Sequence, residues 1–243
     1  MRRLVERPSP NHDARPLGAA IDMLVLHYTG MMTAQEALAR LCDPAAKVSA
    51  HYTVDRDGTV YAHVPEERRA WHAGVSFWAG RPSVNDVSIG IELVNPGHEF
   101  GYVPFTEEQV ESLIELCREI LARHPIPPHR VLAHSDVAPA RKADPGELFP
   151  WQRLADAGIG VWPTPELSSP VYEGGVSVER SSPETGGADF TESLFRFGYG
   201  VPPQVSVPLD AVITAFQRHF RPSCIDGVAD AECAGVLARL LAR

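Results

Sequence analysis

Three short apolar runs in the first 135 residues predict buried β-strands. Met23 to Leu26 is an unbroken apolar run that ends at His27, and Val87 to Val94 forms a second, largely apolar segment. A shorter run, residues 130–133, ends at His134. Continuous apolar runs of this length are typical of strands that are covered on both faces of a sheet.

Between these runs, the pattern predicts a hairpin and two helices. Residues 51–62 place two strand-like segments around an Asp-Arg-Asp-Gly turn, which favours a β-hairpin. Residues 33–36 and 106–109 match capping boxes, and apolar residues recur at helical spacing from Val110 to Leu121. Alternating strands and helices predict an α/β fold, a mixed central sheet flanked by helices.

The pattern changes after residue 162. Residues 163–189 are rich in proline, serine and paired glycines, which indicates a linker. Beyond them, three helical patterns follow, at Thr191–Phe197, Leu209–Phe220 and Ala229–Leu241. We therefore predict an α/β catalytic domain at 1–162, a linker at 163–189 and a small all-α domain of three helices at 190–243.

Composition limits the partners. The net charge of −9 and the pI of about 5.5 argue against binding nucleic acid or an anionic membrane. Residues 1–16 contain no apolar run of the roughly 7–15 residues that an export signal needs, and no later stretch is long enough for a membrane span. These observations predict a cytoplasmic protein without a membrane anchor. The four cysteines lack metal-type spacing, so we expect reduced thiols.

His27, His134 and Asp144 are the candidate metal ligands. Both histidines end predicted strands, where ligands collect in open α/β sheets, and Asp144 lies on an Asp-Pro-Gly turn ten residues after His134. Two imidazoles and a carboxylate suit an open Zn²⁺ site. Asp136 is an alternative third ligand, although it is only two residues from His134.

Two further residues are candidates for catalysis. Glu92 is an acid in an otherwise apolar strand, so it is either a buried ion-pair partner or a general base. Lys142 is either a solvated surface cation or a group that stabilises an oxyanion. The aromatic segment with Trp71, His72 and Trp78 fits either a core or the wall of a groove. Six further histidines are interpreted as structural or surface residues, namely His51, His63, His98, His124, His129 and His219.

The segments LVLHYTG, WHAG, SIGIELVN and HSDVAPARKADPGELFPW together resemble the type 2 N-acetylmuramoyl-L-alanine amidases. This zinc family includes the cytoplasmic amidase of peptidoglycan recycling and shares its fold with peptidoglycan recognition proteins. The resemblance extends over residues 22–162. The C-terminal segments VITAFQRHFRP and IDGVADAE are similar to the small helical peptidoglycan-binding-like domain of a lipoprotein amidase in the same family, whose export and lipidation signal has no counterpart here.

The resemblance implies a site and an activity. It implies zinc on His27, His134 and Asp144, with Glu92 as the catalytic acid/base and Lys142 as the second catalytic residue. The implied reaction is hydrolysis of the amide between the lactyl group of N-acetylmuramic acid and L-alanine, on recycled (anhydro)muropeptides. The alternatives are a periplasmic or lytic amidase acting on intact peptidoglycan, and a non-catalytic protein that binds or senses peptidoglycan.

Overall fold

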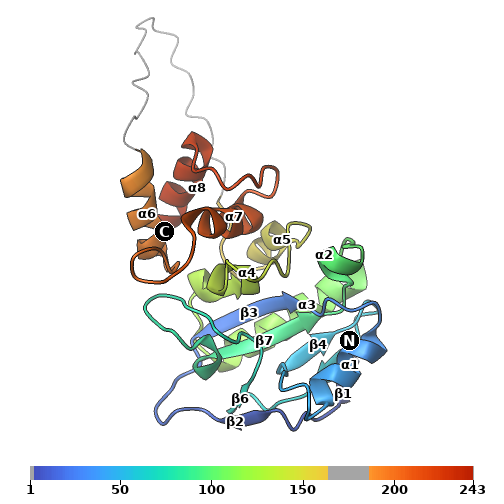
Figure 1. The fold of residues 1–243 in the computed structure, drawn as a ribbon. Coiled ribbons are helices and arrows are strands. Elements are labelled where there is room, and N and C mark those ends of the chain that lie inside the picture. The colour runs from blue at the N-terminus through green and yellow to red at the C-terminus, as the bar shows by residue number, and fades with distance from the viewer. Residues whose placement is uncertain (1–2, 164–185, 243) are drawn as a thin grey trace, which may run out of the picture.

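A computed structural model of the chain describes residues 3–163 and 186–242. In this part of the chain the centre is a six-stranded mixed sheet with the strand order β1-β5-β4-β7-β3-β8 (Figure 1). Its strands are β1 (Leu4–Glu6), β3 (Met23–Tyr28), β4 (Tyr52–Val54), β5 (Val60–Ala62), β7 (Ser88–Leu93) and β8 (Val131–Ala133). Within this six-stranded sheet, β4 and β5 pair antiparallel, as the predicted hairpin, and the other neighbouring strands pair parallel. The predicted α/β fold with a mixed sheet is confirmed.

Short elements surround this sheet, and the sequence did not predict several of them. A second sheet pairs β2 (His12–Ala14) with β6 (Arg68–Ala70). The helices of the α/β part are α1 (Ala34–Cys42), α2 (Gly97–Phe100), α3 (Glu107–Arg123), α4 (His134–Val137) and α5 (Trp151–Asp156). The C-terminal helices are α6 (Gly186–Phe197), α7 (Leu209–Phe220) and α8 (Ala231–Leu241). Two 3-10 turns, Val84–Asp86 and Pro128–Arg130, precede β7 and β8. No helix in these described residues is long and apolar enough to cross a membrane.

The capping predictions hold at one helix fully and at the other in part. Thr33 accepts a hydrogen bond from the Glu36 N–H, and the Glu36 carboxylate accepts one from the Thr33 N–H, so α1 begins with a complete capping box. At α3, Thr106 accepts from the Gln109 N–H, but the Gln109 amide donates instead to the carbonyls of Val54 and Val94. Gln109 therefore connects the helix to the central strands rather than closing the box.

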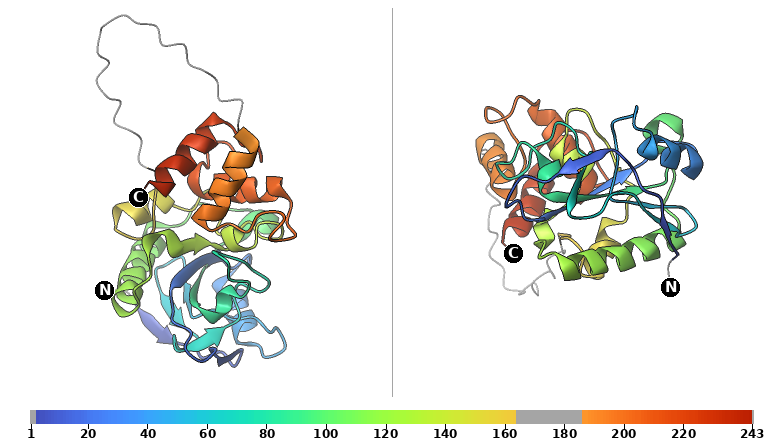
Figure 2. Two further views of the ribbon diagram at one scale, coloured as in Figure 1. Left: turned by 90° about the vertical axis from the view of Figure 1, so that its left-hand side faces the viewer. Right: turned by 90° about the horizontal axis from the view of Figure 1, so that it is seen from below.

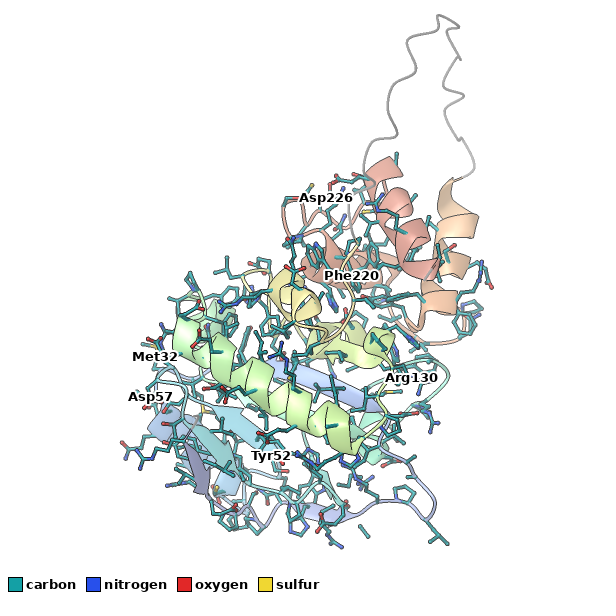
Figure 3. All side chains as sticks on the ribbon, turned by 180° about the vertical axis from the view of Figure 1, so that it is seen from behind. Met32, Tyr52, Asp57, Arg130, Phe220 and Asp226 are labelled. Atoms are coloured by element: carbon teal, nitrogen blue, oxygen red, sulfur yellow. The ribbon has the colours of Figure 1, made fainter. Side chains whose placement is uncertain are left out.

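One face of the sheet packs against α3, which lies across it in the view from behind (Figure 3). Leu24 and Leu26 of β3 and Ile89 of β7 belong to the same buried cluster as the apolar stripe of α3. Because side chains alternate along a strand, Met23, Val25 and His27 point to the opposite face. The carboxyl end of that opposite face carries the site described below.

The opposite face shares its core with the C-terminal helices. Met23 and Val25 lie in one contiguous buried cluster with Phe216 of α7, Leu237 of α8 and Tyr199. Figure 1 and the left view of Figure 2 show α6–α8 beyond α4, on the side of the sheet away from β2 and β6. The linker predicted at 163–189 lies mostly outside the described residues, and the division at 162 and 190 stays a prediction.

This shared cluster predicts that a mutation in α7 will destabilise the α/β part. All four tryptophans, at positions 71, 78, 151 and 162, precede the C-terminal helices. Their fluorescence therefore reports the α/β part together with its interface to these helices, because Trp78 packs against Phe197 and Tyr199 and Trp151 stacks on His219. Phe216→Ala, at a side chain with 0% exposure, should lower the free energy of unfolding by about 3–5 kcal/mol. Urea unfolding followed by tryptophan fluorescence measures the loss.

Val228→Ala, at a side chain that is 57% exposed, is the matched control and should change stability little. A tryptophan transition that keeps its midpoint in Phe216→Ala, while helical circular dichroism is lost earlier, would show instead that the C-terminal helices unfold on their own.

Candidate metal centre and catalytic cleft

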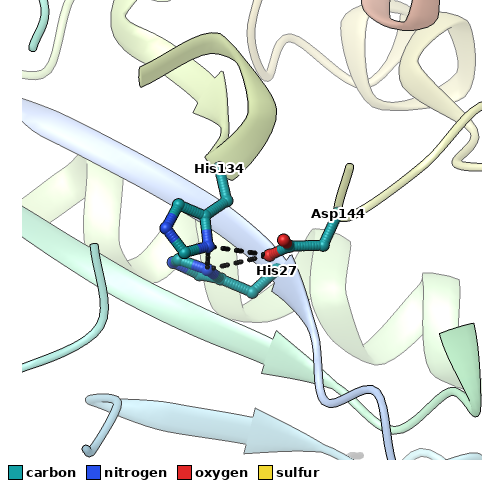
Figure 4. Close-up of side chains that lie close together, drawn as sticks. All are labelled: His27, His134 and Asp144. Carbon is teal, nitrogen blue, oxygen red and sulfur yellow. Dashed lines mark hydrogen bonds and ion pairs between the residues drawn. The ribbon is translucent and has the colours of Figure 1, made fainter. Parts of the chain in front are cut away.

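His27, His134 and Asp144 meet at the carboxyl end of the central strands. β3 and β8 are parallel neighbours in which Leu26 pairs with Ala133, so the two histidines leave the sheet side by side. Nδ1 of His27 lies 2.9 Å from Nδ1 of His134, and Oδ2 of Asp144 lies 3.2 and 2.9 Å from these two atoms (Figure 4). All three side chains are buried. The structure thus brings together the three residues that the sequence predicts as ligands.

A chain of hydrogen bonds fixes the tautomer of His27. The Ser88 hydroxyl donates to the Val84 carbonyl (2.7 Å), so it accepts from the Nε2–H of His72 (3.0 Å). Nδ1 of a neutral His72 is then an acceptor, and it receives the Nε2–H of His27 at 3.0 Å. His27 therefore presents a bare Nδ1 to the other two ligand atoms, as a metal ligand oriented by a second group does.

His134 is oriented in the same way by a backbone carbonyl. Its Nε2 lies 3.1 Å from the Ala73 oxygen, which can only accept, so Nε2 carries the proton and, in the neutral ring, Nδ1 is bare. Two bare nitrogens and a carboxylate oxygen thus face one another without a shared proton. Tetrahedral zinc ligands at roughly 2.0–2.1 Å from the ion lie about 3.3 Å apart, close to the separations observed. The arrangement fits a cation such as Zn²⁺.

Electrostatics favours the ligand form of these groups. Burial and the neighbouring His134 lower the pKa of His27 to about 4, so this imidazole is neutral at pH 7. Burial alone would raise the pKa of Asp144, but positive charge and hydrogen bonds from His134 and His27, present when these rings carry a proton on Nδ1, hold that pKa well below its ordinary value. A neutral imidazole and an ionised carboxylate are the forms that bind a metal.

Glu92 and Lys142 line the cleft that opens beside this cluster. The cleft has a volume of about 170 Å³ and is bordered also by His134, Asp144 and Trp71. Glu92 pairs in register with His27 and shares its face of the sheet. Its Oε2 is buried and has no hydrogen-bond partner among the described residues. Burial, and then the charge of Asp144, raise the pKa of Glu92 well above its ordinary value.

This environment favours one of the two interpretations of Glu92. No ion-pair partner of Glu92 is found among residues 3–163 and 186–242, so the structure does not support the structural ion pair. A carboxyl group with a raised pKa beside three candidate metal ligands is suited to proton transfer. Lys142 is partly buried at the cleft and not a fully solvated surface cation.

The aromatic segment divides between core and groove. Trp71 lines the cleft, whereas Trp78 has 0% exposure and lies in the core. His72 and Ala73 orient the two ligand histidines, a role that the sequence analysis did not assign. The sequence does hold a signal for the role of His72. Ser88, Gly90 and Glu92 alternate with the apolar residues of β7, so these three residues share the face of the sheet that carries the site and leave room there for a polar ring. A Cβ on Gly90 would come 2.4 Å from the His72 ring, so glycine makes room for that ring.

Asp136, the alternative ligand, points away from the cluster. It has 0% exposure and accepts hydrogen bonds from the Ala133 N–H (2.8 Å), the Tyr199 hydroxyl (2.6 Å) and Nδ1–H of His219 (2.7 Å). The ring of His219 is in turn stacked on Trp151. Asp136 therefore ties the turn that carries His134 to the C-terminal helices.

With this geometry established, comparison with known proteins gives the family. The sequence model for N-acetylmuramoyl-L-alanine amidase matches residues 17–147. The chain is 40% identical to the N-acetylmuramoyl-L-alanine amidase AmiD of Escherichia coli, over 98% of this chain and 90% of that protein. The chain therefore belongs to the N-acetylmuramoyl-L-alanine amidase family and is an enzyme of that class.

Solved structures and a shorter relative agree with this assignment. A complex of E. coli AmiD with the substrate anhydro-N-acetylmuramic acid-L-Ala-D-γ-Glu-L-Lys has a TM-score of 0.78 at 39% identity, covering 94% of this chain and 92% of that one. AmpDh3 of Pseudomonas aeruginosa, in complex with anhydromuramic pentapeptide, also has a TM-score of 0.78, at 36% identity and 92% coverage of both chains. The 1,6-anhydro-N-acetylmuramyl-L-alanine amidase AmpD of Enterobacter cloacae is 37% identical over 60% of this chain and 86% of its own.

The raised pKa of Glu92 predicts a pH-dependent stability in the metal-free protein. Because the folded protein holds this proton more tightly than the unfolded chain, the free energy of unfolding should fall as pH rises from about 4.5 through the raised pKa. Glu92→Gln removes the buried charge and should stabilise the protein at pH 8 by on the order of 1 kcal/mol. Urea unfolding in the presence of a chelator, from pH 5 to 8, measures both effects.

Glu115→Gln changes an exposed carboxylate on α3 and is the control. Parallel pH profiles for the wild type and Glu92→Gln would show that the carboxyl group of Glu92 is not destabilised by its surroundings.

Proposed function

We propose that this enzyme is a zinc amidase that cleaves the bond between the lactyl group of N-acetylmuramic acid and L-alanine in 1,6-anhydromuropeptides. The observation that carries the proposal is the set of three converging ligand atoms beside a buried Glu92 whose pKa is raised. The complexes of AmiD and AmpDh3 with anhydromuramyl peptides support the substrate class. All three ligand positions are occupied by residues that can bind zinc. A protein that only binds peptidoglycan does not need this complete set, so the alternative of a non-catalytic binding protein is not favoured.

In this proposal His27, His134 and Asp144 hold the ion. Zinc, when bound, supplies a Lewis acid that polarises the amide carbonyl and makes water more acidic. The orienting groups on the protein keep both ligand nitrogens bare and aimed at a single point, as described for His72 and Ala73. Burial of the ligands excludes the water that would compete for the nitrogens.

Glu92 transfers the proton in this proposal. It accepts the proton of the attacking water and then delivers it to the departing amine of L-alanine. A raised pKa allows one carboxyl group to do both, because it must be ionised to accept the proton and must still hold it for the second transfer. Lys142, on the border of the same cleft, provides the positive charge that stabilises the tetrahedral oxyanion.

We propose that the enzyme works in the cytoplasm on recycled muropeptides. The four cysteines support this compartment, because all four are free thiols and disulfides persist mainly in oxidising compartments. Fractionation of cells followed by immunodetection tests it. Protein recovered with the periplasm or envelope would overturn the recycling role and favour action on intact wall.

Replacing a ligand should remove the metal and the activity together. His134→Ala and Asp144→Ala are expected to purify with less than about a tenth of the wild-type zinc, because a site with two remaining ligands binds the ion weakly. Elemental analysis measures the metal, and mass spectrometry of anhydro-N-acetylmuramic acid-L-Ala-D-γ-Glu-L-Lys measures peptide release. The controls are His129→Ala and Asp156→Ala, which change exposed residues of the same types. Zinc retained at full occupancy in both ligand variants would place the ion elsewhere.

Removing the carboxyl group of Glu92 should separate metal binding from turnover. Glu92→Gln is expected to retain zinc and to lose about 10²–10⁴-fold in kcat, the usual contribution of a positioned general acid or base. The same two measurements apply. Turnover within threefold of the wild type would remove Glu92 from the mechanism.

A further inference from the structure

The short helix α4 holds two of the three candidate metal ligands in place. His134 is its first residue, and the N–H of Ser135 donates to the backbone carbonyl of Asp144 at 3.0 Å. The carboxylate of Asp144 in turn lies 2.9 Å from Nδ1 of His134. Any shift of this helical turn would therefore displace both ligands relative to the third, His27, which belongs to strand β3.

The carboxylate of Asp136 fixes the start of this turn. Its Oδ2 accepts a hydrogen bond from the N–H of Ala133, the residue that precedes His134, at 2.8 Å. Asp136 has 0% exposure, and among the described residues its ion-pair partner is His219, with no lysine or arginine paired to it. A buried carboxylate is stable in one position only while hydrogen-bond donors surround it. The position of the turn therefore depends on the other donors to Asp136.

The other two donors to Asp136 both come from the C-terminal part of the chain. The hydroxyl group of Tyr199, just after helix α6, donates to Oδ1 at 2.6 Å. Nδ1 of His219, on helix α7, lies 2.7 Å from Oδ2 and donates to it, because a carboxylate oxygen can only accept. Burial, and then the charge of Asp136, raise the pKa of Tyr199 well above its ordinary value, so this hydroxyl group keeps the proton that it donates.

Aromatic packing holds both donors rigidly. The ring of Tyr199 has 0% exposure and lies edge-to-face with Trp78, at 4.8 Å between ring centroids. The ring of His219 stacks on Trp151 and on Phe220, with centroids 3.7 and 3.8 Å away. Rings packed in this way have little freedom to follow a moving carboxylate. They therefore fix Asp136 from outside, and a metal site needs its ligands held within about 0.5 Å of the binding geometry.

We propose that Tyr199 and His219 are positioning residues of the metal site, which act through Asp136 to hold His134 and Asp144 where a zinc ion can bind both. The inference rests on the proposed function for the identity of the ion. It gives the C-terminal helices a role in metal affinity, although residues 186–242 lie outside the segment that the family's sequence model matches. Neither residue touches the ion or the substrate in this arrangement, so their effect is on the affinity of the site.

Titration of the zinc-loaded protein with a chelator of known affinity tests this proposal without an activity assay. Tyr199→Phe keeps the packed ring and removes the hydroxyl group, and His219→Phe keeps a stacking ring and removes the Nδ1–H donor. Each variant should bind zinc about tenfold more weakly than the wild type, since loss of an outer hydrogen-bond partner usually costs about 10–100-fold in metal affinity. His219→Asn places an amide N–H where Nδ1–H was and should restore most of the lost affinity. Circular dichroism verifies that each variant is folded under the conditions of the titration.

Two variants serve as matched controls. Leu237→Ala truncates a core side chain of α8 that is 1% exposed and should lower stability, but it removes no donor to Asp136. Tyr61→Phe removes a hydroxyl group from strand β5, outside the core shared with the C-terminal helices. Both controls should bind zinc as tightly as the wild type.

Unchanged zinc affinity in Tyr199→Phe and His219→Phe would overturn the inference. An equally large loss of affinity in Leu237→Ala would also overturn it, because any loosening of the core would then weaken the site. Should His219→Phe fail to fold, the milder Tyr199→Phe decides alone. A wild type that binds no zinc would overturn the proposed function and this inference with it, whereas tight zinc binding that is equal in all variants would overturn the inference alone.

Discussion

The structure depends on holding three electron-rich atoms within about 3 Å of one another in a buried place. Without a cation between them, two bare imidazole nitrogens and a carboxylate oxygen repel, so the surrounding fold has to oppose their separation. The fold restrains both the two imidazole rings and the loop that carries the carboxylate. His72 and the Ala73 carbonyl fix the rings, and the Ser135 N–H, which donates to the Asp144 carbonyl (3.0 Å), closes the loop that returns the carboxylate. The arrangement that suits a metal ion is thus maintained by hydrogen bonds from groups that are not themselves candidate ligands.

The same two strands supply the core and the chemistry because side chains alternate along them. On β7, Ile89, Ile91 and Leu93 are buried towards α3, while Ser88, Gly90 and Glu92 face the site. A shift of one residue in the pairing of β3 with β7 would exchange these faces, placing a carboxylate in the core and isoleucine in the cleft. The apolar packing against α3 therefore also determines the register that sets Glu92 beside His27.

Much of this could be predicted from the sequence where the signal is local. Strand ends, the hairpin, the three C-terminal helical patterns and the convergence of His27, His134 and Asp144 follow from periodicity and from the geometry of parallel strands. Features that depend on distant partners could not be predicted. The environment of Asp136 is set by Tyr199 and His219, which are 63 and 83 residues away in sequence, so the sequence left Asp136 as an alternative ligand despite its two-residue offset from His134. Three-residue strands such as β1, β2 and β6 carry too few side chains to show a period.

The hydrogen bonds of Asp136 also bear on how this chain can be recombined with others. A helical unit attached only through a flexible linker can be exchanged for another binding module without disturbing its neighbour. Here two of the three donors to a fully buried carboxylate come from the C-terminal side. In a chimera that joined the α/β part to a different module, the buried carboxylate of Asp136 would lose its hydrogen bonds from Tyr199 and His219. This carboxylate lies only two residues from His134. Viable fusions are therefore expected to retain Tyr199 and His219 and to add new modules beyond the last helix.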